Sequence, residues 1–190
     1  MRYPLGKIAA GGVLALALLM SSAAYSQAPA APKGSVVVAS PTYTSITMEI
    51  EINRPAAEVW KRVGKYCDVT EWLQVAPCRI TSGKAGEFGA VRSGGGGEVL
   101  VGRTELSYTY TQTPKEGVPY NLYHGTMEAR PVTATTSKIV YTLFFDNSML
   151  PDDAAREKDK EARRARFTKA LQNMKTLAEG GTLPPPPPAK

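Results

Sequence analysis

Few residues in this sequence have the side chains and the spacing that catalysis requires. His124 is the sole histidine among 190 residues, and histidine is the commonest general base near neutral pH. It lies between Tyr123 and Gly125 in a β-rich stretch, so it would share a strand face with the polar Thr126 and Glu128. We therefore expect His124 to point away from the interior and to take no part in proton transfer.

The charged residues form no clearer catalytic pattern. Arg103 and Glu105 share a strand face and Asp146 ends a strand, which is typical of solvated cross-strand charges. The sequence contains no Gly-x-Ser-x-Gly elbow, no His-Glu-x-x-His motif and no pair of inward carboxylates. We therefore predict no catalytic residues and no cofactor.

The two cysteines, Cys67 and Cys78, favour a structural bond over metal chemistry. An N-terminal export leader, described below, would place them in an oxidising compartment, where a disulfide is stable. A zinc site needs about four ligands, and two cysteines with one histidine do not supply them. We expect a Cys67–Cys78 disulfide, with two separate buried thiols as the alternative, and no metal.

One strand and two short helices would open the domain. Residues 46–52 alternate apolar and polar side chains, as a half-buried strand does. Asn53 would cap a helix that has Pro55 in its first turn and Gly64 as its stop, with Trp60 on the apolar side. A second short helix would follow at 68–73.

The middle of the chain predicts an antiparallel meander, because β-rich runs alternate with short turns. Gly94 to Gly97 are followed by no Lys-Ser/Thr and no helix, so they predict a hairpin turn and not a phosphate loop. The expected strands are 79–82, 88–93, 98–107, 108–113, 120–130 and 137–147.

A long helix would close the domain at 152–179. Its second half carries an apolar stripe at helical spacing, whereas the first half, 154–166, offers only alanines and should pack loosely or project. The basic residues between Arg156 and Arg166 alternate with acidic ones, which indicates a solvated face and excludes a nucleic-acid-binding patch.

The two ends of the chain have their own compositions. Arg2 and Lys7, an apolar run at 8–20 and small residues after it predict a signal peptide at 1–26. The apolar run is shorter than the ~20 residues that span a bilayer, which argues against the alternative of an uncleaved anchor. We predict export to the periplasm or beyond, an Ala/Pro-rich linker at 27–41, one domain at 42–179 and a Pro-rich tail at 180–190.

The order of these motifs resembles the START-like or SRPBCC superfamily, also called the polyketide cyclase/dehydrase and lipid transport family. The motifs are Pro55-Ala-Ala-Glu-Val-Trp60, a second helix with Trp72, Pro77 to Ile80, Gly89 to Arg92, Leu106 to Tyr110, Pro119 to Met127 and the long last helix. The resemblance implies an α+β helix-grip fold, in which a curved antiparallel sheet of about seven strands wraps around the C-terminal helix.

The resemblance also implies an apolar cavity between sheet and helix. Strand parity and helical spacing place a set of residues on its walls: Trp60, Trp72, Leu106, Tyr108, Tyr110, Tyr123, Met127, Tyr141, Leu143, Phe145, Phe167, Leu171 and Met174. The same residue types would also fill a solid core, so that alternative stays open. Large aromatic side chains favour a small cavity.

We therefore expect an exported, monomeric protein that binds a small hydrophobic molecule, such as a lipid, sterol or polyketide, without chemistry of its own. One alternative is a cyclase- or dehydratase-like enzyme that uses Tyr108, Tyr110 and Arg103. Another is an envelope interaction protein that makes weak contact with a membrane surface or a partner protein through the charged helix and the proline tail.

Overall fold

The structure, a computed structural model, describes residues 40–94 and 96–185. The predicted leader at 1–26, most of the linker at 27–41 and the tail after residue 185 lie outside this part, so export and these boundaries stay predictions. Within the described residues, no helix is long and apolar enough to cross a membrane.

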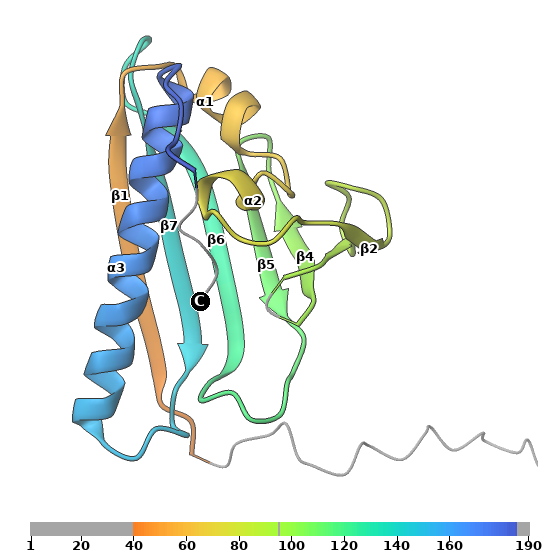
Figure 1. Cartoon of the computed structure of the whole chain (residues 1–190), viewed down its shortest axis with the longest axis vertical. Coiled ribbons are helices and arrows are strands. Elements are labelled where there is room, and N and C mark those ends of the chain that lie inside the picture. The colour runs from red at the N-terminus through yellow and green to blue at the C-terminus, as the bar shows by residue number, and fades with distance from the viewer. Residues whose placement is uncertain (1–39, 95, 186–190) are drawn as a thin grey trace, which may run out of the picture. The chain divides into compact units, whose positions relative to one another are not determined.

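The domain is a single curved antiparallel sheet with one long helix lying along it (Figure 1). The strands follow one another in space as in the sequence, except that the first pairs with the last, giving the order β1-β7-β6-β5-β4-β3-β2. The predicted meander and the α+β helix-grip fold are confirmed. The strands are β1 (Tyr43–Ile52), β2 (Ile80–Ser82), β3 (Val91–Arg92), β4 (Glu98–Arg103), β5 (Ser107–Gln112), β6 (Asn121–Pro131) and β7 (Ser137–Asp146).

Three helices complete the domain: α1 (Ala56–Val63), α2 (Val69–Trp72) and α3 (Asp153–Ala178). Gly64 ends α1 as predicted, but the predicted cap at Asn53 is wrong. Pro55 is extended, with φ −58° and ψ 144°, so the helix begins only after it, and Asn53 lies too far upstream to reach its first N–H groups. The backbone N–H of Asn53 instead donates to Glu179 Oε1 at 2.9 Å.

The inward strand faces are those that alternation predicts. On β6, Tyr123, Gly125, Met127 and Ala129 are buried, and the odd-numbered residues of β7 from Ile139 to Phe145 are buried with them. Gly125 allows close packing, because a Cβ atom there would lie 2.4 Å from the ring of Tyr110. A bulkier residue at 125 would push this ring out of the sheet's inner face.

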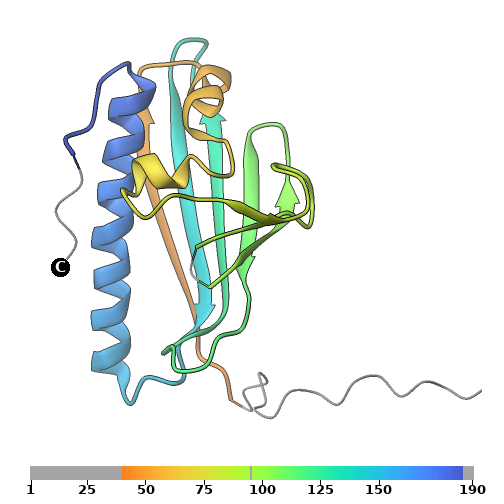
Figure 2. The same ribbon diagram turned by 45° about the vertical axis from the view of Figure 1, so that its right-hand side comes forward.

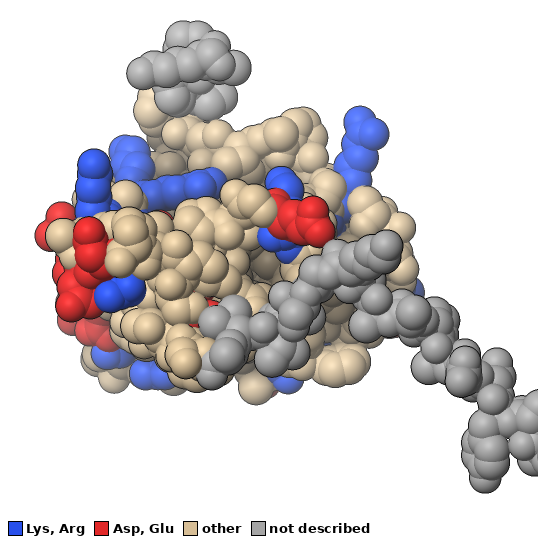
Figure 3. Space-filling view, turned by 90° about the horizontal axis from the view of Figure 1, so that it is seen from below, with Lys and Arg blue, Asp and Glu red and all other residues tan. Residues whose placement is uncertain are grey.

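The long helix has two halves of different character. Phe167, Leu171, Met174 and Leu177 form a buried stripe in the second half, which packs against β1, α1 and α2. The first half is largely exposed and begins with Asp152, whose carboxylate accepts the N–H of Ala155 at 2.8 Å. Seen from below, acidic and basic side chains lie intermixed on the left side of the molecule (Figure 3).

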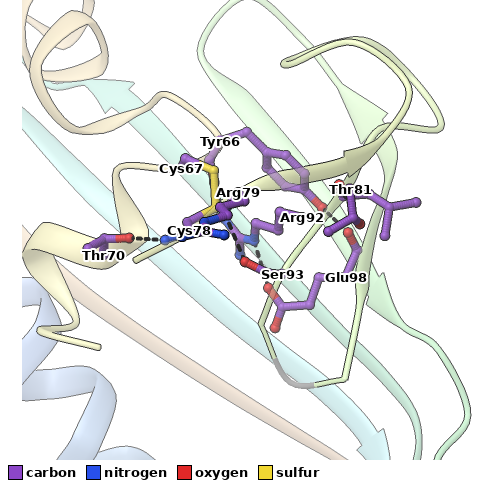
Figure 4. The surroundings of a disulfide bond; sticks show 10 residues. Tyr66, Cys67, Thr70, Cys78, Arg79, Thr81, Arg92, Ser93 and Glu98 are labelled. Atoms are coloured by element: carbon purple, nitrogen blue, oxygen red, sulfur yellow. Dashed lines mark hydrogen bonds and ion pairs between the residues drawn. A yellow bond between two sulfur atoms is a disulfide. The ribbon is translucent and has the colours of Figure 1, made fainter. Parts of the chain in front are cut away.

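The Cys67–Cys78 disulfide is present and ties α2 to the start of β2 (Figure 4). The two Cα atoms are 5.3 Å apart, and the N–H of Cys78 also donates to Thr70 Oγ1 at 2.8 Å. The alternative of two separate thiols is therefore wrong. Together these bonds hold the segment between α2 and β2 across the front of the sheet, where it crosses toward β2 (Figure 2).

Candidate ligand-binding cleft

A cleft of about 760 Å³ lies between the middle of α3 and the inner face of the sheet. One edge is the crossing segment from Val75 to Cys78, which the disulfide holds in place. The turn between β3 and β4 forms a second edge, and Ala162 and Phe167 of α3 form a third. The cleft therefore depends on elements that are far apart in the sequence and are joined only by the fold.

Tyrosine rings make up the inner wall of the cleft. Tyr110, Tyr123 and Tyr141 line it from β5, β6 and β7, and Tyr120 lines it from the loop before β6. The hydroxyls of Tyr110 and Tyr141 lie 3.1 Å apart and share a hydrogen bond. Tyr141 also packs on Phe167, with ring centroids 4.8 Å apart. The wall is thus aromatic and carries buried hydroxyl groups.

Burial keeps these hydroxyls protonated. It raises the pKa of Tyr123 to about 12, against the lowering effect of Arg163, and it raises the pKa values of Tyr110 and Tyr141 well above the ordinary value. A phenol with such a pKa is a neutral hydrogen-bonding group near pH 7 and a poor general base.

A buried ion pair closes one end of the cleft. Arg92 Nε donates to Glu98 Oε2 at 2.7 Å, and the two side chains are 1% and 10% exposed. The guanidinium also donates to the carbonyl of Tyr66 and lies 4.3 Å from the centre of its ring (Figure 4). Burial lowers the pKa of Arg92, but Tyr108 and Glu98 outweigh it and raise that pKa overall, so the guanidinium stays charged.

The ion pair extends into a hydrogen-bond chain along the cleft. Gln112 Nε2 donates to Glu98 Oε1 at 3.0 Å, and the hydroxyl of Tyr120 donates to Gln112 Oε1 at 2.9 Å. Each Glu98 carboxylate oxygen therefore has a partner, from Arg92 or from Gln112. A carboxylate held in this way is a structural anchor rather than a free base.

The first half of α3 contributes two more arginines to the cleft, Arg163 and Arg166. Arg163 is bound to Asp159, one helical turn away, by Nε–Oδ2 at 2.8 Å, and its guanidinium lies 4.4 to 5.3 Å from the ring centres of Tyr120, Tyr123 and Phe145. Its side chain is 16% exposed. The prediction that this half packs loosely or projects is therefore wrong at Arg163, because stacking on aromatic rings holds an arginine without an apolar face.

The predicted lining residues divide among three environments. Tyr110, Tyr123, Tyr141 and Phe167 line this cleft, while Trp60 and Tyr108 line a second, smaller one near α1. The others line neither cleft. Leu106 packs against the core from the β4–β5 connection. The remaining residues lie in the closely packed core: Trp72, Met127, Leu143, Phe145, Leu171 and Met174.

Several lining residues were missed by reasoning from the sequence, above all Arg92, Glu98 and Arg163. Inward positions were chosen for their lack of charge, and that criterion rejects a buried ion pair. A signal was nevertheless present. If the connection comprises the five residues 93–97, one more than the predicted turn, Arg92 and Glu98 stand directly opposite each other on the two strands, as the register shows. Opposite charges at one cross-strand position are a favourable pair.

The other residues with possible chemistry lie elsewhere. His124 is on the outer face of β6, with Nδ1 2.7 Å from the carbonyl of Leu122. Arg103 and Glu105 are exposed at the β4–β5 connection, and Arg103 donates to the carbonyl of Gly86. The expectation of a solvated charge is wrong for Asp146, which is buried because its Oδ1 accepts the backbone N–H groups of Thr42 and Ser148. Among the residues that the structure describes, no three His, Cys, Asp or Glu side chains are close enough to share a metal ion.

Comparison with known proteins finds a matching family model and several structures of similar fold. A family model described as polyketide cyclase / dehydrase and lipid transport matches residues 43–179. A protein from Thermobifida fusca, solved by NMR, has 24% identity and a TM-score of 0.61 over 74% of this chain and 97% of its own.

Two other similar structures are enzymes by name. The Zhui aromatase/cyclase from Streptomyces sp. R1128 has 16% identity and a TM-score of 0.55, over 74% of this chain and 100% of its own. Truncated norcoclaurine synthase from Thalictrum flavum has 11% identity and a TM-score of 0.59, over 77% and 99%. No curated protein matches the sequence.

At these identities the solved structures show the fold alone, whereas the family model covers most of the chain, from β1 to the end of α3. The chain belongs to the polyketide cyclase / dehydrase and lipid transport family.

Proposed function

We propose that this protein is exported and binds a small hydrophobic molecule in the tyrosine-walled cleft, without altering it chemically. The observation that carries the proposal is the cleft itself: about 760 Å³, with an aromatic wall and charged groups that, except for Arg166, are held in ion pairs. Ligand sites for small molecules span roughly 300 to 1,000 Å³ and combine apolar walls with a few fixed polar groups.

The internal pairing of the polar groups favours binding over catalysis. Glu98 is held by Arg92 and Gln112, and Asp159 is held by Arg163. The raised pKa values of the buried tyrosines leave them neutral near pH 7. Such groups orient a ligand through hydrogen bonds, but none is poised to remove a proton.

Export is supported by the leader composition and by the disulfide. Residues 1–26 have the basic start, apolar run and small-residue end of a signal peptide. A Cys67–Cys78 bond is stable in an oxidising compartment and would be reduced in most cytosols. The cleft's front edge depends on that bond, so export and ligand binding are linked through one structural element.

Native mass spectrometry of the protein, exported from a bacterial host with its leader intact, tests the proposal. We expect a bound mass on the order of a few hundred daltons, which organic solvent releases. Recovery of the apo mass alone from several expression hosts would contradict the proposal. Conversion of the extracted molecule on incubation with fresh protein would favour the cyclase- or dehydratase-like alternative.

A matched pair of variants locates the binding site. Ala162 lines the cleft, whereas the exposed Ala165, on the same helix, does not. We expect Ala162→Trp to fill the cleft and abolish the bound mass, and Ala165→Trp to retain it. Equal retention of ligand by both variants would place the ligand elsewhere.

A further inference from the structure

A second cleft, of about 440 Å³, lies on the other side of the Arg92 ion pair, between the end of α1 and the β4–β5 connection. Its floor consists of the rings of Trp60, Tyr66 and Tyr108 with the side chain of Leu100. The ring centres of Trp60 and Tyr108 are 5.7 Å apart, and those of Tyr66 and Tyr108 are 5.4 Å apart. The planes of these two ring pairs are inclined by 53° and 83°, so the floor is aromatic but is made of both faces and edges of rings.

The two clefts are separate sites. Arg92 lines the first cleft, and its guanidinium lies 4.3 and 5.7 Å from the ring centres of Tyr66 and Tyr108, which line the second. The hydroxyl of Tyr66 donates to the carbonyl of Glu98 at 2.9 Å, which fixes this layer in place. A ligand in one cleft is thus divided from the other by a closely packed arginine and two rings.

The rim of the second cleft is cationic. Lys61, Lys65 and Arg103 line it, and none of its lining residues is acidic. The ammonium groups of Lys61 and Lys65 form no hydrogen bond or ion pair with any described residue. The nearby Asp68 accepts the backbone N–H of Lys65 at 2.9 Å and attracts its ammonium group, but it does not line the cleft. No carboxylate within the cleft offsets the positive charge of its rim.

This balance differs from that of the first cleft, where three arginines (Arg92, Arg163 and Arg166) are offset by two carboxylates, Glu98 and Asp159. Cations with no carboxylate beside them in the cleft, above an aromatic floor, attract a molecule with a negative group and a flat apolar body. We propose that the second cleft binds a small organic anion of this kind. The proposal stands independently of the ligand in the first cleft.

The two tryptophans provide a built-in test. Trp60 lines the second cleft, whereas Trp72 is 0% exposed and lines neither cleft. We would record the two indole N–H signals of ¹⁵N-labelled protein while adding naphthalene-2-sulfonate, and assign them with Trp60→Phe. We expect a saturable shift of the Trp60 signal and no shift of the Trp72 signal.

Neutral 2-naphthylmethanol, which has the same ring system, tests the need for charge. We expect it to bind at least about tenfold more weakly than the sulfonate, since it gains nothing from the cations. Equal affinity of the two probes would overturn the proposal, as would the absence of a saturable Trp60 shift.

Charge variants complete the test. We expect Lys61→Gln/Lys65→Gln to weaken sulfonate binding about tenfold. The control Lys158→Gln/Lys169→Gln removes the same charge from two exposed lysines of α3 that do not line the cleft, and should leave the affinity within about twofold. An equal loss in both double variants would show a net-charge effect and overturn a specific site.

Discussion

The two halves of α3 cover the sheet in different ways, and the difference explains where the first cleft lies. The second half places Phe167, Leu171 and Met174 against the sheet and the short helices, and this region is closely packed. The first half offers no large apolar side chain, and beneath Ala162 and Arg163 the first cleft opens. A cleft thus forms where the apolar stripe of the helix ends.

The two regions are also held together by different forces. The region under the second half of α3, here called the packed half, depends on apolar burial, which is insensitive to protonation. The region around the first cleft, under the first half of α3, is here called the open half. It depends on an ion pair, a chain of hydrogen bonds and a cation over aromatic rings. Changes that act on polar groups should therefore destabilise the open half, and deletions of methyl groups should destabilise the packed half.

Alkaline pH should have the largest effect on stability, because it favours ionisation of several buried tyrosines in the open half. Burial raises the pKa of Tyr123 to about 12, against about 10 in an unfolded chain, and also raises those of Tyr110 and Tyr141. Between these values the unfolded chain loses protons that the folded chain keeps, so stability is full below pH 10 and falls as pH rises through 12.

We expect cooperative unfolding in this window, with buried tyrosines ionising only as the fold is lost. Absorbance near 295 nm and circular dichroism, followed together, check this result. Smooth ionisation of these tyrosines with intact secondary structure would show that the open half is loosely packed, and would break the comparison.

The next largest effect should come from Arg92→Leu. This variant leaves Glu98 buried without its charged partner, and breaking a buried pair in this way costs about 3–5 kcal/mol in the free energy of unfolding. Urea denaturation measures the loss.

Arg62→Leu is the matched control for Arg92→Leu. Arg62 and Glu71 form an ion pair of the same 2.7 Å length, but their side chains are 41% and 47% exposed. We expect this control to lose less than about 1 kcal/mol. Equal losses of stability in the two variants would mean that burial does not increase the contribution of the Arg92–Glu98 pair.

In the packed half, Leu171→Ala should cost about 2–5 kcal/mol by leaving a cavity at a side chain that is 2% exposed. It should leave the affinity of the first cleft for its ligand unchanged, because Leu171 does not line that cleft. Calorimetric unfolding and ligand titration measure the two quantities. Lys169→Ala, on the exposed side of the same helix, should change stability by less than about 0.5 kcal/mol.

The packed half was predictable from the sequence and the open half largely was not. Alternation in β6 and β7 and the stripe from Phe167 to Leu177 follow one rule, that apolar side chains at the right period face inward. The rule succeeds wherever the interior is apolar. It therefore identified the inward faces of the strands and the second half of α3.

The open half departs from that rule at charged residues that line the first cleft. Arg92 and Glu98 are buried because each satisfies the other, and Arg163 is held by rings from β6, β7 and the loop before β6. Such pairing depends on contacts across the fold. The charge of each residue, taken alone, therefore predicts an outward-facing position. Large aromatics on one strand face also cannot reveal whether they fill a core or line a cleft, since the facing helix decides it.

The smallest effect should be the most informative about the open half. Tyr141→Phe removes the hydrogen bond to the Tyr110 hydroxyl and should cost about 1 kcal/mol in stability. Tyr66→Phe removes one buried hydrogen bond, to the carbonyl of Glu98, and should cost about the same. Only Tyr141 lines the first cleft, so only its variant should alter the affinity for the ligand there. Denaturation and ligand titration of both variants separate the two roles. Equal affinity changes would mean that the two clefts communicate through Arg92, and the layer between them would then be a coupling element rather than a wall.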